Sequence, residues 1–166
     1  MLLAASTELA VFDVLIRALH IGAALILGGA AAYQWIALVP SLATVDEARR
    51  IEFREMLAAR WRIIAWTAMA ILLLTGLLNF IVNKIPEYRS HPQKGIYHAL
   101  FGVKFLLALA AFHAGTVLTL PGPKGEKYRA HAKFWLTLLL LFIAAIVVIA
   151  AILRDFPILF PAPAAH

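Results

Sequence analysis

Cysteine is absent from this chain of 166 residues, and its absence excludes disulfides, thiol redox chemistry and thiolate metal sites. Charge is also scarce, because Asp, Glu, Lys and Arg together make up 14% of the residues. The methionines are limited to Met1, Met56 and Met69, so the soft sulfur ligands that Cu(I) prefers are few. A glycine-rich phosphate loop is missing as well. The function must therefore depend on a small number of other polar side chains.

Long apolar runs are the main feature that the sequence does have. Hydrophobic residues make up 63% of it, and a helix needs about 20 mostly apolar residues to cross the hydrocarbon core of a bilayer. Four segments meet this requirement, namely residues 11–39, 61–82, 97–120 and 134–153. No basic region of a cleaved signal sequence precedes the first segment, so we expect it to be retained. The sequence predicts an all-α polytopic membrane protein, with residues 1–166 forming one transmembrane domain, a four-helix bundle.

Basic residues are distributed unevenly between the two sides of the predicted bundle. One side has nine, all within residues 49–62 and 124–133, and the other has five, namely Arg17, Lys84, Arg89, Lys94 and Arg154. Connections on the cytoplasmic side are enriched in Lys and Arg. We therefore expect both termini to face outward from a bacterial inner membrane. The net charge of +6 follows from the same rule, so nucleic acid is not expected as a partner.

Residues 41–62, between the first two spans, carry both charged and apolar side chains. Thr44 to Glu47 matches a capping box, in which the threonine oxygen accepts from free backbone amides at a helix start. Apolar residues then recur among the charges at a loose helical spacing, namely Ile51, Phe53, Met56 and Leu57. We expect a cytoplasmic amphipathic helix that runs into the second span and lies on anionic headgroups. A docking surface for a protein partner is the alternative.

Ionisable side chains inside the spans are costly, so they usually face the bundle interior and have a partner or a task. Their depths follow from the helical rise of about 1.5 Å per residue. His20 lies roughly 13 Å and Lys104 about 10 Å below the outer surface, with Thr75 at a similar depth. We predict one polar layer of these three residues, and a second layer nearer the outer surface formed by Arg17, Asn79 and His98.

These two layers contain the residue types of a cofactor site. A positive charge on Lys104 favours the neutral form of a neighbouring His20, which is the form that binds a metal or haem iron. The same lysine could hold a haem propionate or a substrate carboxylate. The alternatives are structural. Lys104 could extend along its stem toward the headgroups, His98 could be a boundary residue, and His20 could be an interior histidine held by hydrogen bonds.

A further polar layer is predicted in the inner half of the bundle. His113 lies about 10 Å from the cytoplasmic end of the third span. Four other polar residues are expected near this depth, namely Tyr33, Gln34, Thr67 and Thr137. His98 and His113 lie broadly on one face of their helix, which would suit two stacked sites. The alternative for His113 is a hydrogen-bonded structural histidine.

Four short motifs carry a resemblance to known proteins. They are LHIGAALILGG at residues 19–29, RWR at 60–62, LLLTGLLN at 72–79 and GVKFLLAL at 102–109. These motifs resemble the membrane domain of CopD-type copper-resistance proteins, and their order is similar to that in HemJ-type protoporphyrinogen oxidases. The resemblance extends over most of the chain.

The resemblance implies roles for particular residues. His20 matches the family's histidine in helix one, and Lys104 matches its lysine in helix three. Arg60 or Arg62 matches its arginine in helix two. HemJ-type proteins are associated with haem b and porphyrinogen oxidation, and CopD-type proteins with copper uptake across the inner membrane.

Three functions remain open. The first is membrane redox chemistry, as in a haem-dependent oxidoreductase. In this function His20 binds the iron of haem b, and Lys104 lies near the haem propionates. The second is copper uptake or resistance, with His20 and His98 as ligands of Cu(II). The third is a non-catalytic accessory subunit of a larger membrane complex, or a homo-oligomer, in which the polar residues serve helix association. We favour haem because soft ligands for copper are scarce.

Overall fold

The computed structural model describes residues 2–161, with side chains from residue 11 onward, and every regular element within those residues is helical. The long helices are α1 (Leu2–Tyr33), α3 (Glu47–Leu78), α5 (Lys94–Leu118) and α7 (Ala132–Arg154). The shorter elements are η1 (Gln34–Leu38), α2 (Val39–Leu42), η2 (Asn79–Lys84), α4 (Ile85–Glu87), α6 (Gly122–Ala130) and α8 (Phe156–Leu159), and η1 and η2 are π-helical. The predicted all-α class is confirmed.

Four helical stretches are long and apolar enough to cross a membrane, as the sequence predicts. They are Val11–Leu42, Glu47–Glu87, Lys94–Leu118 and Ala132–Arg154. Large apolar side chains cover the outside of the bundle, for example Leu25 at 70% and Ile63 at 74% exposure. So much exposed apolar surface is unfavourable in water and favourable in lipid. The four helices are therefore compatible with an integral membrane protein.

Two of the membrane helices continue past the ends that the sequence predicts. Pro40 follows η1 and Pro86 follows η2, and the chain stays helical through both prolines. A proline ring clashes with the carbonyl four residues before it and has no N–H to donate. A π-helical turn is wider and relieves that crowding. The predicted ends at residues 39 and 82 are therefore too early.

α3 begins in the charged connection and continues without a break into the membrane span, which confirms a helix that runs into the second span. Asp46 caps its first turn, because its Oδ1 accepts from the Arg49 N–H at 3.1 Å. The predicted capping box at Thr44 is wrong. The Thr44 hydroxyl instead donates to the Ser41 carbonyl at 2.8 Å, within the turn that precedes the helix.

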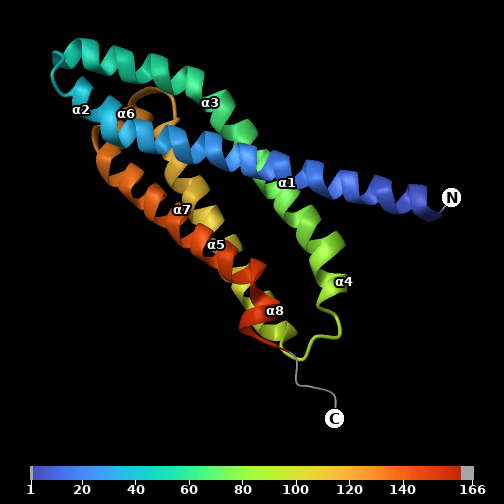
Figure 1. Cartoon of the computed structure of the whole chain (residues 1–166). Coiled ribbons are helices and arrows are strands. Elements are labelled where there is room, and N and C mark those ends of the chain that lie inside the picture. The colour runs from blue at the N-terminus through green and yellow to red at the C-terminus, as the bar shows by residue number, and fades with distance from the viewer. Residues whose placement is uncertain (1, 162–166) are drawn as a thin grey trace.

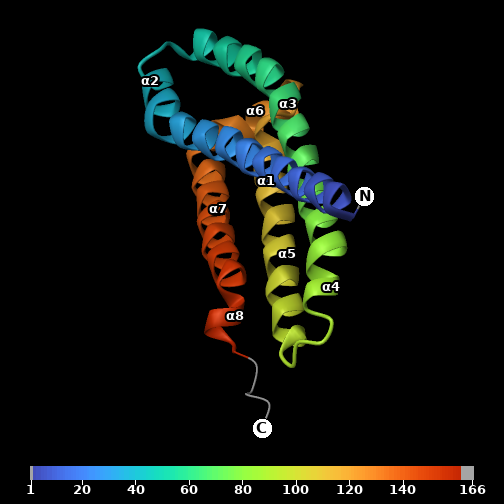
Figure 2. The ribbon, with the colours of Figure 1, turned by 45° about the vertical axis from the view of Figure 1, so that its right-hand side comes forward.

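The long helices form two pairs, α1 with α3 and α5 with α7. Figures 1 and 2 show α5 and α7 side by side, whereas α1 crosses the other helices obliquely and its N-terminal end lies far from α8. The pairs meet where α3 packs against α5 and where α1 and η1 approach α7. Gly28 lies beside Ile143, and the Trp35 Nε1–H donates to Thr137 Oγ1 at 2.9 Å. Away from this contact α1 diverges from α7, which leaves space between the pairs.

The contacts between helices involve small side chains. Half of the buried apolar residues that the structure describes are alanines, namely Ala23, Ala31, Ala58, Ala65, Ala68, Ala111 and Ala114. Small residues let helix backbones approach closely in lipid, where dispersion replaces the hydrophobic drive between helices. The interior of the bundle therefore consists largely of backbone packed against backbone.

The two ends of the bundle differ in composition. The α6 end comprises residues 39–62 and 119–133, and it is rich in arginine and lysine. The α8 end comprises residues 84–97 and 154–160, and it contains a buried cluster with two tyrosines and Phe156.

Arginines at the α6 end close the last turn of α5. The final carbonyl groups of a helix have no helical N–H partner. Here Arg62 Nε donates to the Thr119 carbonyl at 2.7 Å, and the buried Arg129 donates to the Leu120 carbonyl. The short helix α6 that supplies Arg129 is not predicted, because its prolines and glycines are typical of a break.

The aromatic cluster closes the α8 end. Tyr88 and Tyr97 stack with their ring centroids 4.0 Å apart, and the fully buried Phe156 meets both rings edge-on. Burial and the negative charge of Glu87 raise the pKa of the Tyr88 hydroxyl above its usual value. Tyr88 therefore stays neutral at ordinary pH and packs as an apolar ring between α4, α5 and α8.

Candidate functional site

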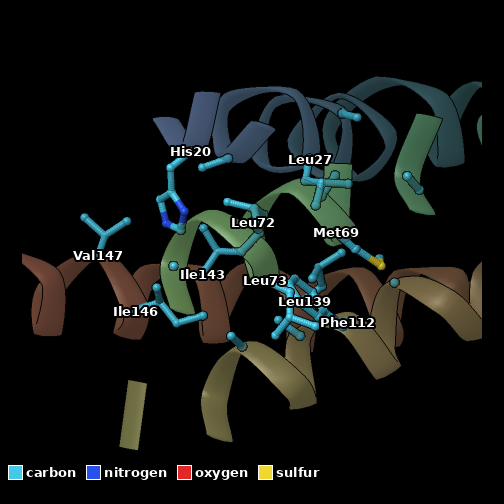
Figure 3. A pocket seen from close by; sticks show the side chains of 18 of the residues that line it. His20, Leu27, Met69, Leu72, Leu73, Phe112, Leu139, Ile143, Ile146 and Val147 are labelled. Carbon is cyan, nitrogen blue, oxygen red and sulfur yellow. The ribbon is translucent and has the colours of Figure 1, made fainter. Parts of the chain in front are cut away.

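A cavity of about 830 Å³ lies between the two helix pairs, and all four long helices contribute to its wall. Figure 3 shows the His20 side chain pointing from α1 into this space, toward apolar side chains of the other helices. The labelled apolar residues are Leu27, Met69, Leu72, Leu73, Phe112, Leu139, Ile143, Ile146 and Val147. Small-molecule and cofactor sites typically have volumes of about 300–1,000 Å³. The cavity is therefore large enough for a cofactor.

The hydrogen bonds around His20 determine its tautomer. Thr75 Oγ1 lies 2.8 Å from His20 Nδ1, and the threonine donates its own proton to the Ile71 carbonyl. The threonine oxygen therefore accepts from an Nδ1–H of His20, which leaves a lone pair on Nε2. Metal-binding histidines have this arrangement, in which the second ring nitrogen donates to a neighbouring oxygen. The structure thus brings two predicted site residues into direct contact.

Gly76, which lies in the LLLTGLLN motif but is not among the predicted site residues, makes room for the His20 ring. A Cβ atom added at Gly76 would lie 3.3 Å from His20 Cε1, which is tighter than ordinary van der Waals contact. Any larger side chain at this position would push the imidazole away from α3. Thr75 and Gly76 therefore act on the same ring, the first by a hydrogen bond and the second by leaving space.

Lys104 lines the same cavity and is partly buried. Its Nζ forms no hydrogen bond or ion pair with any residue that the structure describes. Among the described residues that line the cavity, every one with a full charge is basic: Arg17, Arg54, Arg60, Lys84, Lys104, Arg129 and Arg154. Four of these side chains pair with carboxylates that do not line the cavity, and the charges of Arg60, Lys104 and Arg154 are left to attract an anionic group.

A polar network beside the cavity connects α1 to η2. Asp13 Oδ2 pairs with Arg17 at 2.8 Å, and Asp13 Oδ1 accepts from the Asn83 amide at 2.8 Å. The same amide donates to Asn79 Oδ1 at 2.9 Å. Arg17 and Asn79 are predicted site residues and both line the cavity, whereas Asp13 and Asn83 are not predicted. Asp13 lies four residues before Arg17, and Asn83 lies four residues after Asn79. This helical spacing is the signal that could have identified Asp13 and Asn83.

His98 does not line the cavity that His20 faces. Its ring packs edge-on against Phe80, with 5.6 Å between the ring centroids, and lies next to Tyr97. Its Nε2 is buried and has no hydrogen-bond partner among the described residues. The structure therefore places His20 and His98 in different surroundings and does not present them as one ligand pair.

His113 is exposed on the outside of the bundle, where its ring lies edge-on to Trp135 with 6.0 Å between the centroids. Thr67 is also exposed, and it lines a separate groove between α1 and α3. Neither side chain lines the main cavity. Helix rotation, which depth alone does not give, places both on other faces.

Three other residues of the predicted inner layer lie near the α6 end. Tyr33 and Gln34 line the cavity there. Thr137 accepts a hydrogen bond from Trp35 and so joins α7 to η1. The inner part of the cavity therefore has polar residues on its wall, without His113 among them.

The donors available for a metal ion are few. The described residues contain no group of three or more His, Cys, Asp or Glu side chains that could hold a metal ion together. The Met69 sulfur accepts a hydrogen bond from Thr116 at 3.8 Å, and Met69 lies about 9 Å along α3 from Thr75. His20 is thus a single imidazole in a largely apolar cavity. This donor set suits a group that takes one protein ligand, such as haem.

Comparison of the chain with protein-family models, curated proteins and solved structures gave no match. The resemblance to CopD-type and HemJ-type proteins therefore stays a prediction from four short motifs. A functional proposal must depend on the geometry of the cavity and on its polar side chains.

Proposed function

We propose that this chain is a membrane redox protein that binds haem b through His20. One observation carries the proposal. The imidazole is fixed at Nδ1 by Thr75, its Nε2 keeps a lone pair, and the ring points into a cavity of about 830 Å³ (Figure 3). A histidine with one nitrogen hydrogen-bonded and the other free is prepared to bind iron.

The residues of the cavity fit haem in two further respects. Most of the wall is apolar, and it includes the rings of Phe101, Phe105 and Phe112, which suit the faces of a porphyrin. Lys104 and Arg17 line the same cavity as His20 and are suited to the two propionate groups. Helix bundles commonly hold cofactors between facing helices in this manner.

Bound haem would supply one-electron transfer between the ferrous and ferric states of its iron. The residues of the chain hold and surround it. Thr75 orients the imidazole, Gly76 lets the ring lie close to α3, and the apolar wall excludes water. Lys104 binds a carboxylate, whose charge removes the cost of an unpaired ammonium group in an apolar site. An electron partner would come from a larger membrane complex or a second copy of the chain.

We propose further that the α6 end faces the cytoplasm of a bacterial inner membrane. Support comes from the nine basic residues of that end and its flanks, against five on the other side. The motif resemblance to CopD-type and HemJ-type proteins supports the same location. In this orientation both termini face outward, and the basic connections lie against anionic headgroups.

An absorption spectrum of the detergent-purified protein tests the haem proposal. We expect a Soret band when the protein is oxidised and sharp α and β bands after reduction with dithionite. His20→Ala should lose these bands while eluting from gel filtration at the wild-type volume. Copper content, measured on the same samples, separates the alternatives. A colourless protein with copper would support copper uptake or resistance, and one with neither would favour an accessory subunit.

Lys104 has its own test, in which haem is compared with its dimethyl ester, which lacks free propionates. We expect the wild-type apoprotein to bind haem about tenfold more tightly than the ester, since a hydrogen bond to a charged group contributes about 1.5 kcal/mol or more. Lys104→Met should reduce this preference, because only Arg17 then remains for the propionates. The exposed Lys94 is a matched control, and Lys94→Met should keep it. An unchanged preference in Lys104→Met would contradict the assigned role.

A further inference from the structure

We propose that the part of the cavity near the α6 end binds an anionic phospholipid from the surrounding bilayer. Its phosphate would lie at Arg60 and Arg54, and one acyl chain would extend into the cavity. This site goes beyond the proposed haem site and uses other residues. Gln34, on the wall here, is 14 positions from His20 along continuous helix, which is about 21 Å.

The charge of the wall at this end is one-sided. Arg54, Arg60 and Arg129 line it, and none of the described residues that line the cavity is acidic. Behind them, the Glu126 carboxylate pairs with Arg54 at 3.0 Å and with Arg129 at 3.3 Å. Two guanidinium groups therefore share one carboxylate, and the guanidinium of Arg60 has none. A phosphate group would complete this cluster, because guanidinium matches phosphate oxygens in both charge and geometry.

Arg60 is the residue most available to a ligand. It is exposed at the side of the cavity, and its guanidinium has no hydrogen-bond or ion-pair partner within the described part of the chain. The other arginines nearby are engaged, for example Arg62 with a backbone carbonyl. Arg60 follows the apolar Leu57 by about one helical turn, so its charged group lies at the border between apolar and basic surface.

The apolar part of the wall explains why the anion should be a lipid. Leu38, Leu42 and Leu57 lie on the wall near the arginines, and Met69 continues it toward the centre of the bundle. A small soluble anion would leave this apolar surface uncovered, whereas an acyl chain covers it. Trp61 lines the same region, and tryptophan is typical of the headgroup level of a membrane. Basic pockets between membrane helices are known to bind anionic headgroups.

Native mass spectrometry of the full chain, released from nanodiscs, tests the proposal. The nanodiscs contain phosphatidylcholine with a minor fraction of phosphatidylglycerol. We expect one retained phosphatidylglycerol per chain, and about a fivefold weaker binding in Arg60→Gln, since a basic residue contributes about 1 kcal/mol to such a contact. Arg60→Lys should keep most of the binding. Arg49→Gln is the matched control, because Arg49 lies on α3, does not line the cavity and is largely exposed.

The outcomes are distinguishable from those of the haem test. His20→Ala should lose the haem bands and keep the phosphatidylglycerol, so failure of either proposal leaves the other testable. Equal retention of the two lipids, or equal loss in Arg60→Gln and Arg49→Gln, would overturn the lipid site. Displacement of the lipid by inorganic phosphate alone would also overturn it, because the site would then bind a soluble anion.

Discussion

His20 and His113 are alike in sequence and different in the structure. Each lies in an apolar helix and is followed closely by glycine and alanine. The His20 ring points into the cavity and contacts Thr75. The His113 ring is exposed on the outer surface and meets only the edge of Trp135 among the described aromatic rings. The difference arises from helix rotation, and it teaches that the depth of a polar residue in a membrane helix does not make it part of a site.

Removal of the two imidazoles is the strongest test of this comparison. His20→Gly should abolish haem binding, and added imidazole should restore the Soret band, because the small ligand can occupy the space left by the side chain. His113→Gly should keep the wild-type spectrum with or without imidazole. The measurement is a titration of each apoprotein with haem. A spectrum lost in His113→Gly and kept in His20→Gly would reverse the assignment.

A second test compares two threonines of α3, namely Thr75, which contacts His20, and Thr67, which does not line the cavity. Thr75→Val removes the hydrogen-bond acceptor of His20 at nearly constant volume, and loss of such a partner typically weakens binding by about 10–100-fold. Thr67 is exposed on the same helix, so Thr67→Val should change the affinity for haem by less than about twofold. The dissociation constants of the two apoproteins are compared. Equal effects would show that the hydroxyl does not orient the imidazole.

Substitution of a glycine by alanine should have the smallest effect on haem binding. Gly76→Ala brings a methyl group to 3.3 Å from the His20 ring, so the imidazole must move by a few tenths of an ångström. We expect a shifted Soret maximum and a few-fold faster loss of haem. At Gly102 nothing lies within 4 Å of an added Cβ, and Gly102→Ala should behave as wild type. The rate of haem transfer to apomyoglobin is the measurement. An unchanged rate in Gly76→Ala would mean that the ring does not depend on this contact.

Hydropathy predicted the fold class and the four spans, because the thickness of a bilayer sets the length that an apolar helix needs to cross it. The helix ends were less predictable. Pro40 and Pro86 are typical of helix ends, but π-helical turns accommodate both. Thr44 and Asp46 are both suitable caps in sequence, and only the structure decides in favour of Asp46.

The candidate site was predictable where the depth of a residue in the membrane decides which side chains meet. The estimate that His20 and Thr75 lie at one level follows from the helical rise alone, and the two residues are in contact. Gly76 could not be found in this way, because its proximity to His20 depends on how closely α1 approaches α3. His113 could not be excluded either, because its exposure depends on the rotation of α5 against α7.

The alanines of the bundle interior have a consequence for how this sequence can change. Where helix backbones pack directly on each other, as at Ala65 or Ala114, the distance between the helices is set by the absence of side-chain bulk. One added methylene group at such a position separates two helices, whereas exchanges among leucine, isoleucine and valine on the lipid-facing surface leave the packing untouched. Small side chains at the interior positions therefore specify the packing of this bundle. Two chains that keep it can share the architecture while having few identical residues elsewhere.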